Sequence, residues 1–323
     1  MKKEIYEQLG SELRQSESDI KLVESGNNNS QCPRCHSNKI VKRARVNGSQ
    51  RFYCKDCKKY YTIKTKTAFE NSNKPIEMWA KYIDLMCKKL SLREITKELD
   101  ISLPTAFLWR HKILAALSSM KSEKLSGIVE ADETYFRESQ KGNKQLKRKS
   151  HKSGKSKLTH LQLRVFLGLT EEEYKASRLK RGLSNDQVCV LTAMDRKNNI
   201  FGKPAGYGKM KSNFLRIIKP QIDKKSTLIT DGEPLYSTLQ VAKHKKLEHG
   251  LSKDKVYNIG RTDELHTSMK GLINGTFRGV ATKYLDNYVN YVGIMKRKKL
   301  NMDSVISCVN SITRESLKRK VAF

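Results

Sequence analysis

The residues with the clearest chemistry are four cysteines arranged in two Cys-x-x-Cys pairs. Cys32 and Cys35 form the first pair, Cys54 and Cys57 form the second, and eighteen residues separate the pairs. Thiolates are soft, anionic ligands, and two such pairs can place four of them tetrahedrally around one Zn²⁺. A redox-active dithiol would need only one pair. The spacing therefore predicts one structural zinc ion in a zinc ribbon, with a hairpin between the pairs.

Two carboxylates stand at the ends of apolar runs that are typical of buried strands. Asp132 ends the run IVEAD, and Asp231 follows the run STLIT. Side chains at strand ends lie along one edge of a sheet, where open α/β folds bind ligands. Mg²⁺ prefers oxygen ligands, and two such ions about 3.5–4 Å apart can promote displacement at a phosphodiester. Because aspartate is also a turn and cap residue, spacing alone leaves a metal-dependent nuclease and a structural role open.

A helix-turn-helix pattern covers residues 92–114, upstream of the first carboxylate. The first helix is expected over 91–99, the turn at Asp100 and Ile101, and the second helix over about 103–117. The second helix of such a unit can enter the major groove of DNA. An ordinary helical hairpin is the alternative. The second helix is expected to bury Phe107 or Leu108 and to expose four polar residues, Thr105, Arg110, His111 and Lys112. Of these, we expect Thr105, Arg110 and Lys112 to contact DNA.

Charge points to an anionic partner for the whole chain. The chain has 323 residues with 65 Lys and Arg against 33 Asp and Glu, a formal net charge of +32. Such an excess is self-repulsive in a compact fold and favours nucleic acid or an anionic membrane surface as partner. Because the basic residues are spread over several segments, we favour nucleic acid. The sequence offers neither a signal-peptide pattern nor a long apolar run, so we expect a cytoplasmic, nucleoid-associated protein without a membrane partner.

Composition changes divide the chain into five parts. They are an N-terminal helical or flexible segment at 1–30, the zinc ribbon at 31–70, the helix-turn-helix region at 75–120, an α/β domain at 127–300 with a basic insertion at about 137–185, and a basic tail at 301–323. Within the α/β domain, the apolar patterns predict strands at 128–132, 188–195, about 200–205 and 226–230. They also predict helices at 212–222 and 234–244 and from about 262 onward.

Four segments of the sequence resemble a known family. IVEADETYFRES, RGLSNDQVCVLTAMDR, LITDG and FRGVATKYLDNYVNY are similar to the insertion-sequence transposases that have an N-terminal zinc ribbon and a ribonuclease-H-like catalytic core. GVATKYLDNY is the most specific piece, and the resemblance covers roughly residues 30–295. It implies a mixed α/β catalytic sheet and an acidic triad or an Asp-Asp-Asn variant. Asp132 and Asp231 match the first two members.

The third member of the set departs from the family pattern. Similar transposases carry an Asn three residues before a His and a Lys four residues after that His, and here Asp263 precedes His266 and Lys270. Asp263 therefore occupies the Asn position, and the resemblance favours it over the adjacent Glu264. The two side chains would point about 100° apart on a helix. Lys270 is either a contact to a DNA phosphate or a solvated surface lysine.

The resemblance implies a DNA transposase, a Mg²⁺-dependent polynucleotidyl transferase. Such an enzyme binds the terminal inverted repeats of its element, cuts double-stranded DNA and joins the freed end to a target. Two Mg²⁺ ions, replaceable by Mn²⁺, are expected on Asp132, Asp231 and Asp263. A homodimer or larger assembly is expected on DNA. The alternatives are a catalytically inactive DNA-binding regulator and a nuclease or resolvase that cuts without rejoining.

Overall fold

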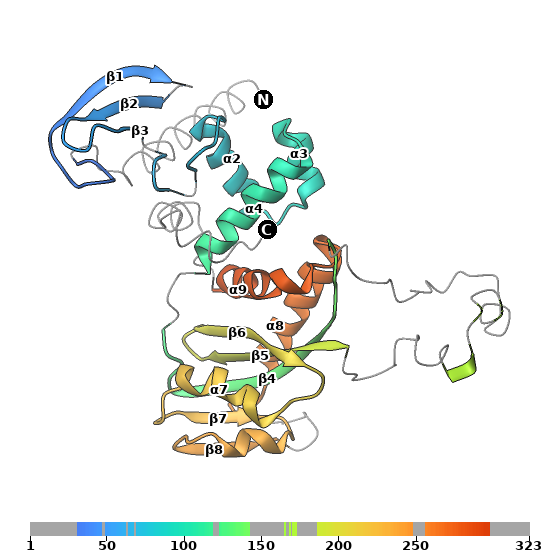
Figure 1. Ribbon diagram of the computed structural model, residues 1–323. Helices are drawn as coiled ribbons and strands as arrows, with labels where there is room; N and C mark the ends of the chain where they lie inside the picture. Colours follow the sequence, from blue (N-terminus) through green and yellow to red (C-terminus); the bar gives the residue numbers. More distant parts are fainter. Residues whose placement is uncertain are drawn as a thin grey trace, which may run out of the picture.

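The computed structural model describes residues 31–46, 49–62, 64–67, 69–118, 123–142, 165, 168, 170–172, 186–247 and 256–297. The segments expected at 1–30 and 301–323 lie outside these residues, as does most of the basic insertion. The described chain forms a small sheet, a group of three helices and a five-stranded sheet with its own helices (Figure 1). None of the described helices has the length and apolar character needed to cross a membrane.

The small sheet consists of three antiparallel strands, β1 (Ile40–Val46), β2 (Ser49–Cys54) and β3 (Tyr60–Thr62). The β1–β2 hairpin lies between the two cysteine pairs, as predicted. On the inner face, the rings of Phe52 and Tyr61 stack with their centroids 5.3 Å apart. This core is very small, because its buried members among the described residues are Cys32, Phe52, Cys54 and Tyr61.

Three helices follow, α2 (Ile76–Cys87), α3 (Leu92–Leu99) and α4 (Leu103–Leu117), and the last two lie at the predicted positions. Ser91 and Glu94 form a capping box, in which each side chain accepts a hydrogen bond from the backbone N–H of the other residue. Asp100 ends α3 in the left-handed conformation, and the Ser102 side chain caps α4. Local capping chemistry therefore sets the turn between α3 and α4.

The predicted exposure of α4 is wrong at two positions, because Arg110 and His111 are buried, each 2% exposed. Of the two residues offered as alternatives for burial, Phe107 is 38% exposed and Leu108 is half-buried. The Arg110 guanidinium donates to the carbonyl of Leu90 and lies over the ring of Phe277. The sequence pattern missed this burial because α4 is covered on two sides, by its neighbouring helices and by the C-terminal helix described below.

The larger sheet has the strand order β6-β5-β4-β7-β8. Strands β4 (Ile128–Arg137), β5 (Gln187–Asp195) and β6 (Ile200–Tyr207) form an antiparallel meander. β7 (Thr227–Thr230) pairs parallel to β4, and β8 (Lys243–Lys246) pairs parallel to β7. This combination of order and direction is ribonuclease-H-like, which confirms the expected fold class.

Helices cover both faces of this sheet. On one face lies α7 (Leu215–Ile218), flanked by the 3₁₀ turns η1 (Ser212–Phe214) and η2 (Lys219–Gln221). On the other lie α8 (Gly260–Lys270) and α9 (Leu285–Lys296), joined by the π-helical segment η5 (Gly271–Thr276) and the 3₁₀ turn η6 (Thr282–Tyr284).

Two predicted elements in this domain need correction. The strand predicted at 128–132 continues to Arg137, so Asp132 lies within β4 and not at its end. The helix predicted at 234–244 is instead a 3₁₀ turn, η3 (Pro234–Thr238), followed by β8. β8 has the sequence KHKK, which carries no strand periodicity. It is an edge strand, where lysines are favoured because they discourage pairing with other chains.

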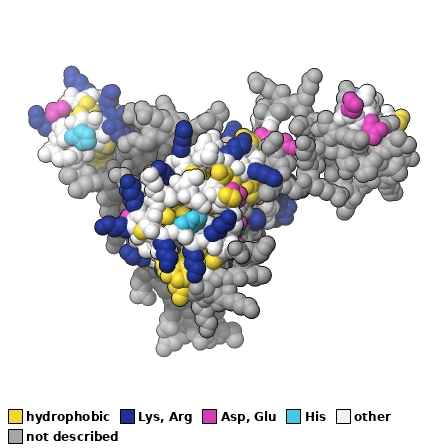
Figure 2. All heavy atoms as spheres, turned by 90° about the horizontal axis from the view of Figure 1, so that it is seen from below, with side chains coloured by type: hydrophobic (Ala, Val, Ile, Leu, Met, Phe, Trp, Pro, Cys, Tyr) yellow, Lys and Arg dark blue, Asp and Glu magenta, His cyan; other side chains and the backbone are white. Residues whose placement is uncertain are grey.

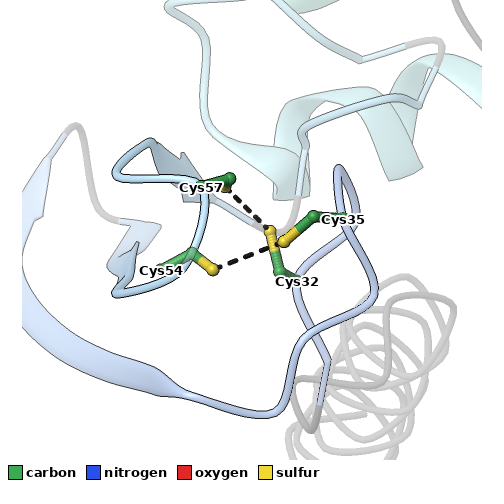
Figure 3. Close-up of side chains that lie close together, drawn as sticks. All are labelled: Cys32, Cys35, Cys54 and Cys57. Carbon is green, nitrogen blue, oxygen red and sulfur yellow. Dashed lines mark hydrogen bonds between the residues drawn. The ribbon is translucent and has the colours of Figure 1, made fainter.

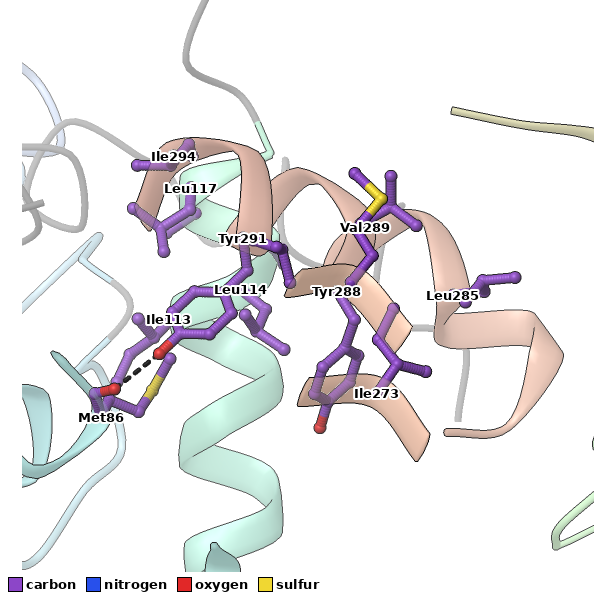
Figure 4. Packing of buried hydrophobic residues seen from close by; sticks show 14 of the residues in the cluster. Met86, Ile113, Leu114, Leu117, Ile273, Leu285, Tyr288, Val289, Tyr291 and Ile294 are labelled. Atoms are coloured by element: carbon purple, nitrogen blue, oxygen red, sulfur yellow. Dashed lines mark hydrogen bonds between the residues drawn. The ribbon is translucent and has the colours of Figure 1, made fainter. Parts of the chain in front are cut away.

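The helical group and the large sheet share one hydrophobic core. Helix α9 lies between α4 and the sheet (Figure 1). Leu114 and Leu117 of α4 belong to the same buried cluster as Tyr288 and Val289 of α9, and the Tyr291 hydroxyl donates to the Met86 carbonyl at 2.5 Å (Figure 4). The cluster continues to Val188 and Val190 of β5. The predicted boundary near residue 120 therefore separates two regions that do not have separate cores.

Replacing Trp109 by Ala should destabilise both regions together. Trp109 is 3% exposed and stacks on Trp79 with ring centroids 3.8 Å apart. Truncating a buried tryptophan typically costs about 3–5 kcal/mol of unfolding free energy. Urea unfolding followed by tryptophan fluorescence and by far-UV circular dichroism should show one shared transition at lower urea. Leu103→Ala, at a position of α4 that is 45% exposed, should change little. Separate transitions for the helices and the sheet would contradict the shared core.

Candidate metal centres

The four predicted cysteines come together at the base of the ribbon (Figure 3). The Sγ atoms of Cys32 and Cys57 are 3.7 Å apart, and those of Cys35 and Cys54 are 3.5 Å apart. Four thiolates at zinc–sulfur distances of about 2.3 Å in a tetrahedron would be roughly 3.8 Å apart. The observed separations therefore fit one zinc ion, and four protein ligands would leave no position for water.

Backbone groups favour the thiolate form at one of these cysteines. The backbone N–H of Cys57 points at the Cys54 sulfur and is the main cause that lowers the pKa of this thiol to about 7. A lowered pKa makes the anionic ligand available near neutral pH.

The carboxylates gather where β4 continues beyond its neighbour β7. The last paired residues of these two strands are Glu130 and Ile229, and β7 ends at Thr230. Past this point, no described strand pairs with this edge of β4. Here the Glu133 N–H donates to the Asp132 carboxylate at 2.8 Å. Asp231 follows β7 directly. The carboxylate oxygens of Asp132, Glu133 and Asp231 lie within 4.8 Å of one another.

Helix α8 brings a second group of ligands to the same aspartate. Carboxylate oxygens of Asp132 and Asp263 and a ring nitrogen of His266 also lie within 4.8 Å of one another. The Nδ1 atom of His266 is 3.5 Å from the Asp132 carboxylate. Glu264, the rival to Asp263, is exposed and forms an ion pair with Lys296 of α9. The structure thus brings Asp132, Asp231 and Asp263 together and turns Glu264 away.

Hydrogen bonding favours one tautomer of His266. The Thr192 hydroxyl can donate its one proton to the Asp132 carbonyl at 2.9 Å and lies 2.7 Å from His266 Nε2. In this arrangement Nε2 carries a proton and donates it to Thr192. Burial lowers the pKa of His266 to about 4, so the ring is neutral at pH 7. Its Nδ1 lone pair then faces Asp132, as a metal ligand requires.

The carboxylates repel one another and are only partly solvated. The side chain of Asp132 is 13% exposed. Burial, followed by the charges of Glu133 and Asp231, raises its pKa to about 8. Burial and the charge of Asp231 raise the pKa of Glu133 to about 7. A divalent cation among these groups would offset both the repulsion and the loss of hydration.

Two members of the clusters were missed as candidate ligands by sequence reasoning. Strand alternation correctly places Glu133 on the face opposite Asp132, but both side chains reach the open edge of β4. Glu133 also accepts a hydrogen bond from the buried Tyr236 hydroxyl at 3.2 Å. His266 belongs to the family pattern that identifies Asp263. Its position one turn after Asp263 on α8 could have identified it as a second ligand from this helix.

The predicted DNA-contact residues occupy different environments. Thr105 is half-buried at the start of α4, where its hydroxyl bonds to Ser102 at 2.8 Å. Lys112 is half-buried, with its amine 3.5 Å from the Glu70 carbonyl. Lys270 is exposed at the end of α8. The buried Arg110 does not offer its guanidinium to DNA in this conformation, because it bonds within the core.

Basic side chains are prominent on the surface near the large sheet. Figure 2 shows one face on which Lys and Arg clearly outnumber Asp and Glu. The edge strand β8 contributes Lys243, Lys245 and Lys246 to the described surface, and Lys246 approaches Gly232, the residue after Asp231. Positive charge is therefore available beside the acidic cluster.

Comparison with known proteins gives two findings. Residues 162–294 match the ISXO2-like transposase domain. A protein of Halobacterium salinarum described as an uncharacterized protein in transposable element ISH50 is 31% identical over 115 residues, which are 34% of this chain and 38% of that protein. The chain thus matches well under half the length of that relative. The family match includes Asp231, Asp263 and His266, whereas Asp132 precedes it. These two matches confirm the resemblance to insertion-sequence transposases, and residues 162–294 are the part that is similar to the ISXO2-like transposase domain.

Proposed function

We propose that this chain is a DNA transposase that cuts and joins DNA strands at a centre for two divalent ions. The observation that carries the proposal is the position of Asp132, which belongs to two ligand groups at once. Asp132, Glu133 and Asp231 would hold one Mg²⁺ or Mn²⁺, and Asp132, Asp263 and His266 would hold the other. When bound, two such ions activate an attacking oxygen and stabilise the leaving oxygen of a phosphodiester.

The surrounding residues support this chemistry in distinct ways. Thr192 holds the His266 ring with Nδ1 toward Asp132, and Tyr236 holds the Glu133 carboxylate. We propose that Asp263 replaces the Asn of similar transposases as a ligand, since an aspartate supplies both an oxygen and a negative charge. Lys270 is proposed to contact a DNA phosphate at the rim of the centre.

DNA binding is proposed for the ribbon and for α4. On the outer face of the ribbon, Arg51 lies over the Tyr60 ring at 4.0 Å and Arg43 over the Tyr53 ring at 5.7 Å. Arginines oriented in this way retain N–H groups for phosphate. Thr105 and Lys112 stay the candidates on α4. Because strand transfer requires two element ends, we propose that at least two chains assemble on the DNA.

The test of this function is DNA processing in Mg²⁺ with labelled DNA that carries the ends of the element. Wild-type protein should give nicked and strand-transferred products. Asp231→Ala should lower the rate at which these products form by at least about 100-fold. That factor is the upper end of the usual loss for residues that only orient metal ligands, and Asp231 is proposed to be a ligand itself. Asp223→Asn is the control, since Asp223 is exposed and its bond to the Lys225 N–H can pass to the amide oxygen. Binding without products would favour the inactive regulator, and cuts without joining would favour the nuclease or resolvase.

Asp132→Asn should stabilise the metal-free protein. Because the folded-state pKa of Asp132 is raised to about 8 from an ordinary value of 3.8, stability is lost as pH rises between these values. In EDTA, the melting temperature of the variant should therefore exceed that of wild type, by more at pH 8 than at pH 6. Added Mg²⁺ should raise the melting temperature of wild type more than that of the variant. An equal or lower melting temperature for Asp132→Asn at pH 8 would contradict the proposed repulsion.

Zinc removal should unfold the ribbon and leave the main core intact. The ribbon core is too small to be stable alone, so metal binding supplies its folding free energy. Cys54→Ser should lose the expected one equivalent of zinc and the ribbon signals in NMR spectra. Tryptophan fluorescence should still report a folded core, because Trp79 and Trp109 both lie in the shared core. Cys87→Ser should keep the zinc. Full zinc content in Cys54→Ser would refute the four-cysteine site.

A further inference from the structure

One buried carboxylate next to the acidic cluster belongs to neither ligand group. Glu130 is 1% exposed and lies two residues before Asp132, so both side chains point to the α8 face of the sheet. A charged group at this depth needs compensating partners. Those partners come from two other elements of the fold.

The first set of partners is the start of α8. The backbone N–H groups of Arg261 and Thr262 approach Glu130 Oε2 at 3.0 and 3.3 Å, and the Thr262 hydroxyl approaches it at 3.4 Å. The first N–H groups of a helix have no partner within the helix, and the helix dipole favours a negative charge there. The residue at the cap position, Ile259, has no side chain that can fill this role. A side chain from strand β4 therefore caps α8.

The second partner fixes the other oxygen of Glu130. Arg196, which follows β5, forms an ion pair with Glu130 Oε1 at 2.7 Å. The same guanidinium donates to the carbonyl of Val256 at 2.6 Å, in the segment that leads into α8. Arg261 of α8 in turn approaches the carbonyls of Asp195 and Arg196 at 3.4 Å. The start of α8 is thus tied to β4 and to the turn after β5 by one connected network.

We propose that Glu130 is a positioning residue for the metal centre. Asp263 is the residue directly after Thr262, and His266 lies one turn farther along α8. By holding the first turn of α8 against β4, Glu130 sets the position and rotation that bring Asp263 and His266 to Asp132. The inference rests on the proposed function, because it concerns how the ligands of that centre are placed.

A purely structural ion pair is the alternative explanation. Buried ion pairs are weak evidence for stability, since the cost of desolvation can exceed the attraction between the charges. Three of the four groups that contact Glu130 belong to α8, and the fourth also contacts the chain that leads into α8. The contacts of Glu130 therefore hold α8, the helix that carries two of the proposed ligands, as a positioning role requires.

The experiment is a measurement of Mn²⁺ affinity by electron paramagnetic resonance, well below the melting temperature of every variant. Glu130→Ala should weaken Mn²⁺ binding by about 10–100-fold, the usual effect of removing a residue that orients metal ligands. Glu130→Gln keeps an oxygen that can accept from Arg261 and Thr262, and should therefore recover most of the affinity. Trp109→Ala is the control, because it destabilises the shared core without altering the contacts at the start of α8.

The outcomes separate this inference from the proposed function. Weak binding in Glu130→Ala with recovery in Glu130→Gln and wild-type affinity in Trp109→Ala supports the positioning role. Wild-type affinity in a folded but less stable Glu130→Ala overturns it and leaves the proposed metal centre standing. If wild-type protein binds no more Mn²⁺ than Asp132→Asn, both the proposed function and this inference are overturned.

Discussion

The mutual repulsion of the carboxylates around Asp132 is the constraint on which the rest of the large-sheet domain depends. Like charges in a poorly solvated place separate unless the backbone holds them. Here Asp132 and Glu133 are fixed by pairing of β4 with β5, Asp231 by the parallel pairing of β7, and Asp263 by α8. The order of strands in the sheet therefore does more than bury apolar surface, since it forces acidic groups from three elements into one place.

The open edge of β4 explains why residues from both faces of the sheet take part. While β7 accompanies β4, apolar side chains alternate between two separate clusters, one with Val129 and Leu228 and the other with Ile128 and Ile229. Where β7 stops, no other strand of the described residues pairs with this edge of β4. Glu133 and Asp132 can then approach the same point from opposite sides. The shortness of β7, with four residues, is accordingly part of the architecture of the site.

The sequence predicted those parts of the structure that depend on local patterns. The cysteine spacing, the helix-turn-helix pattern at 92–114 and the apolar runs around Asp132 and Asp231 are local signals. The structure agrees with the elements that they predict, except that β4 continues beyond Asp132. The burial of Arg110, the strand at Lys243–Lys246 and the role of Glu133 depend on what packs or pairs from elsewhere in the chain. No local pattern encodes these features, because each arises from a neighbour that is distant in sequence. Asp263 was identified through family resemblance, and α8 then places it beside Asp132.

The position of α9 between α4 and the sheet has a geometrical consequence for the proposed action on DNA. With Tyr291 bonded to Met86 on one side and Val289 packed toward the sheet on the other, one continuous buried cluster joins the described helices α2 and α4 to the sheet that carries the acidic cluster. If α4 binds the end of an element, the thickness of α9 sets the distance from the recognised bases to the scissile phosphate. The packing of these helices would then fix the number of base pairs between the recognised sequence and the cut.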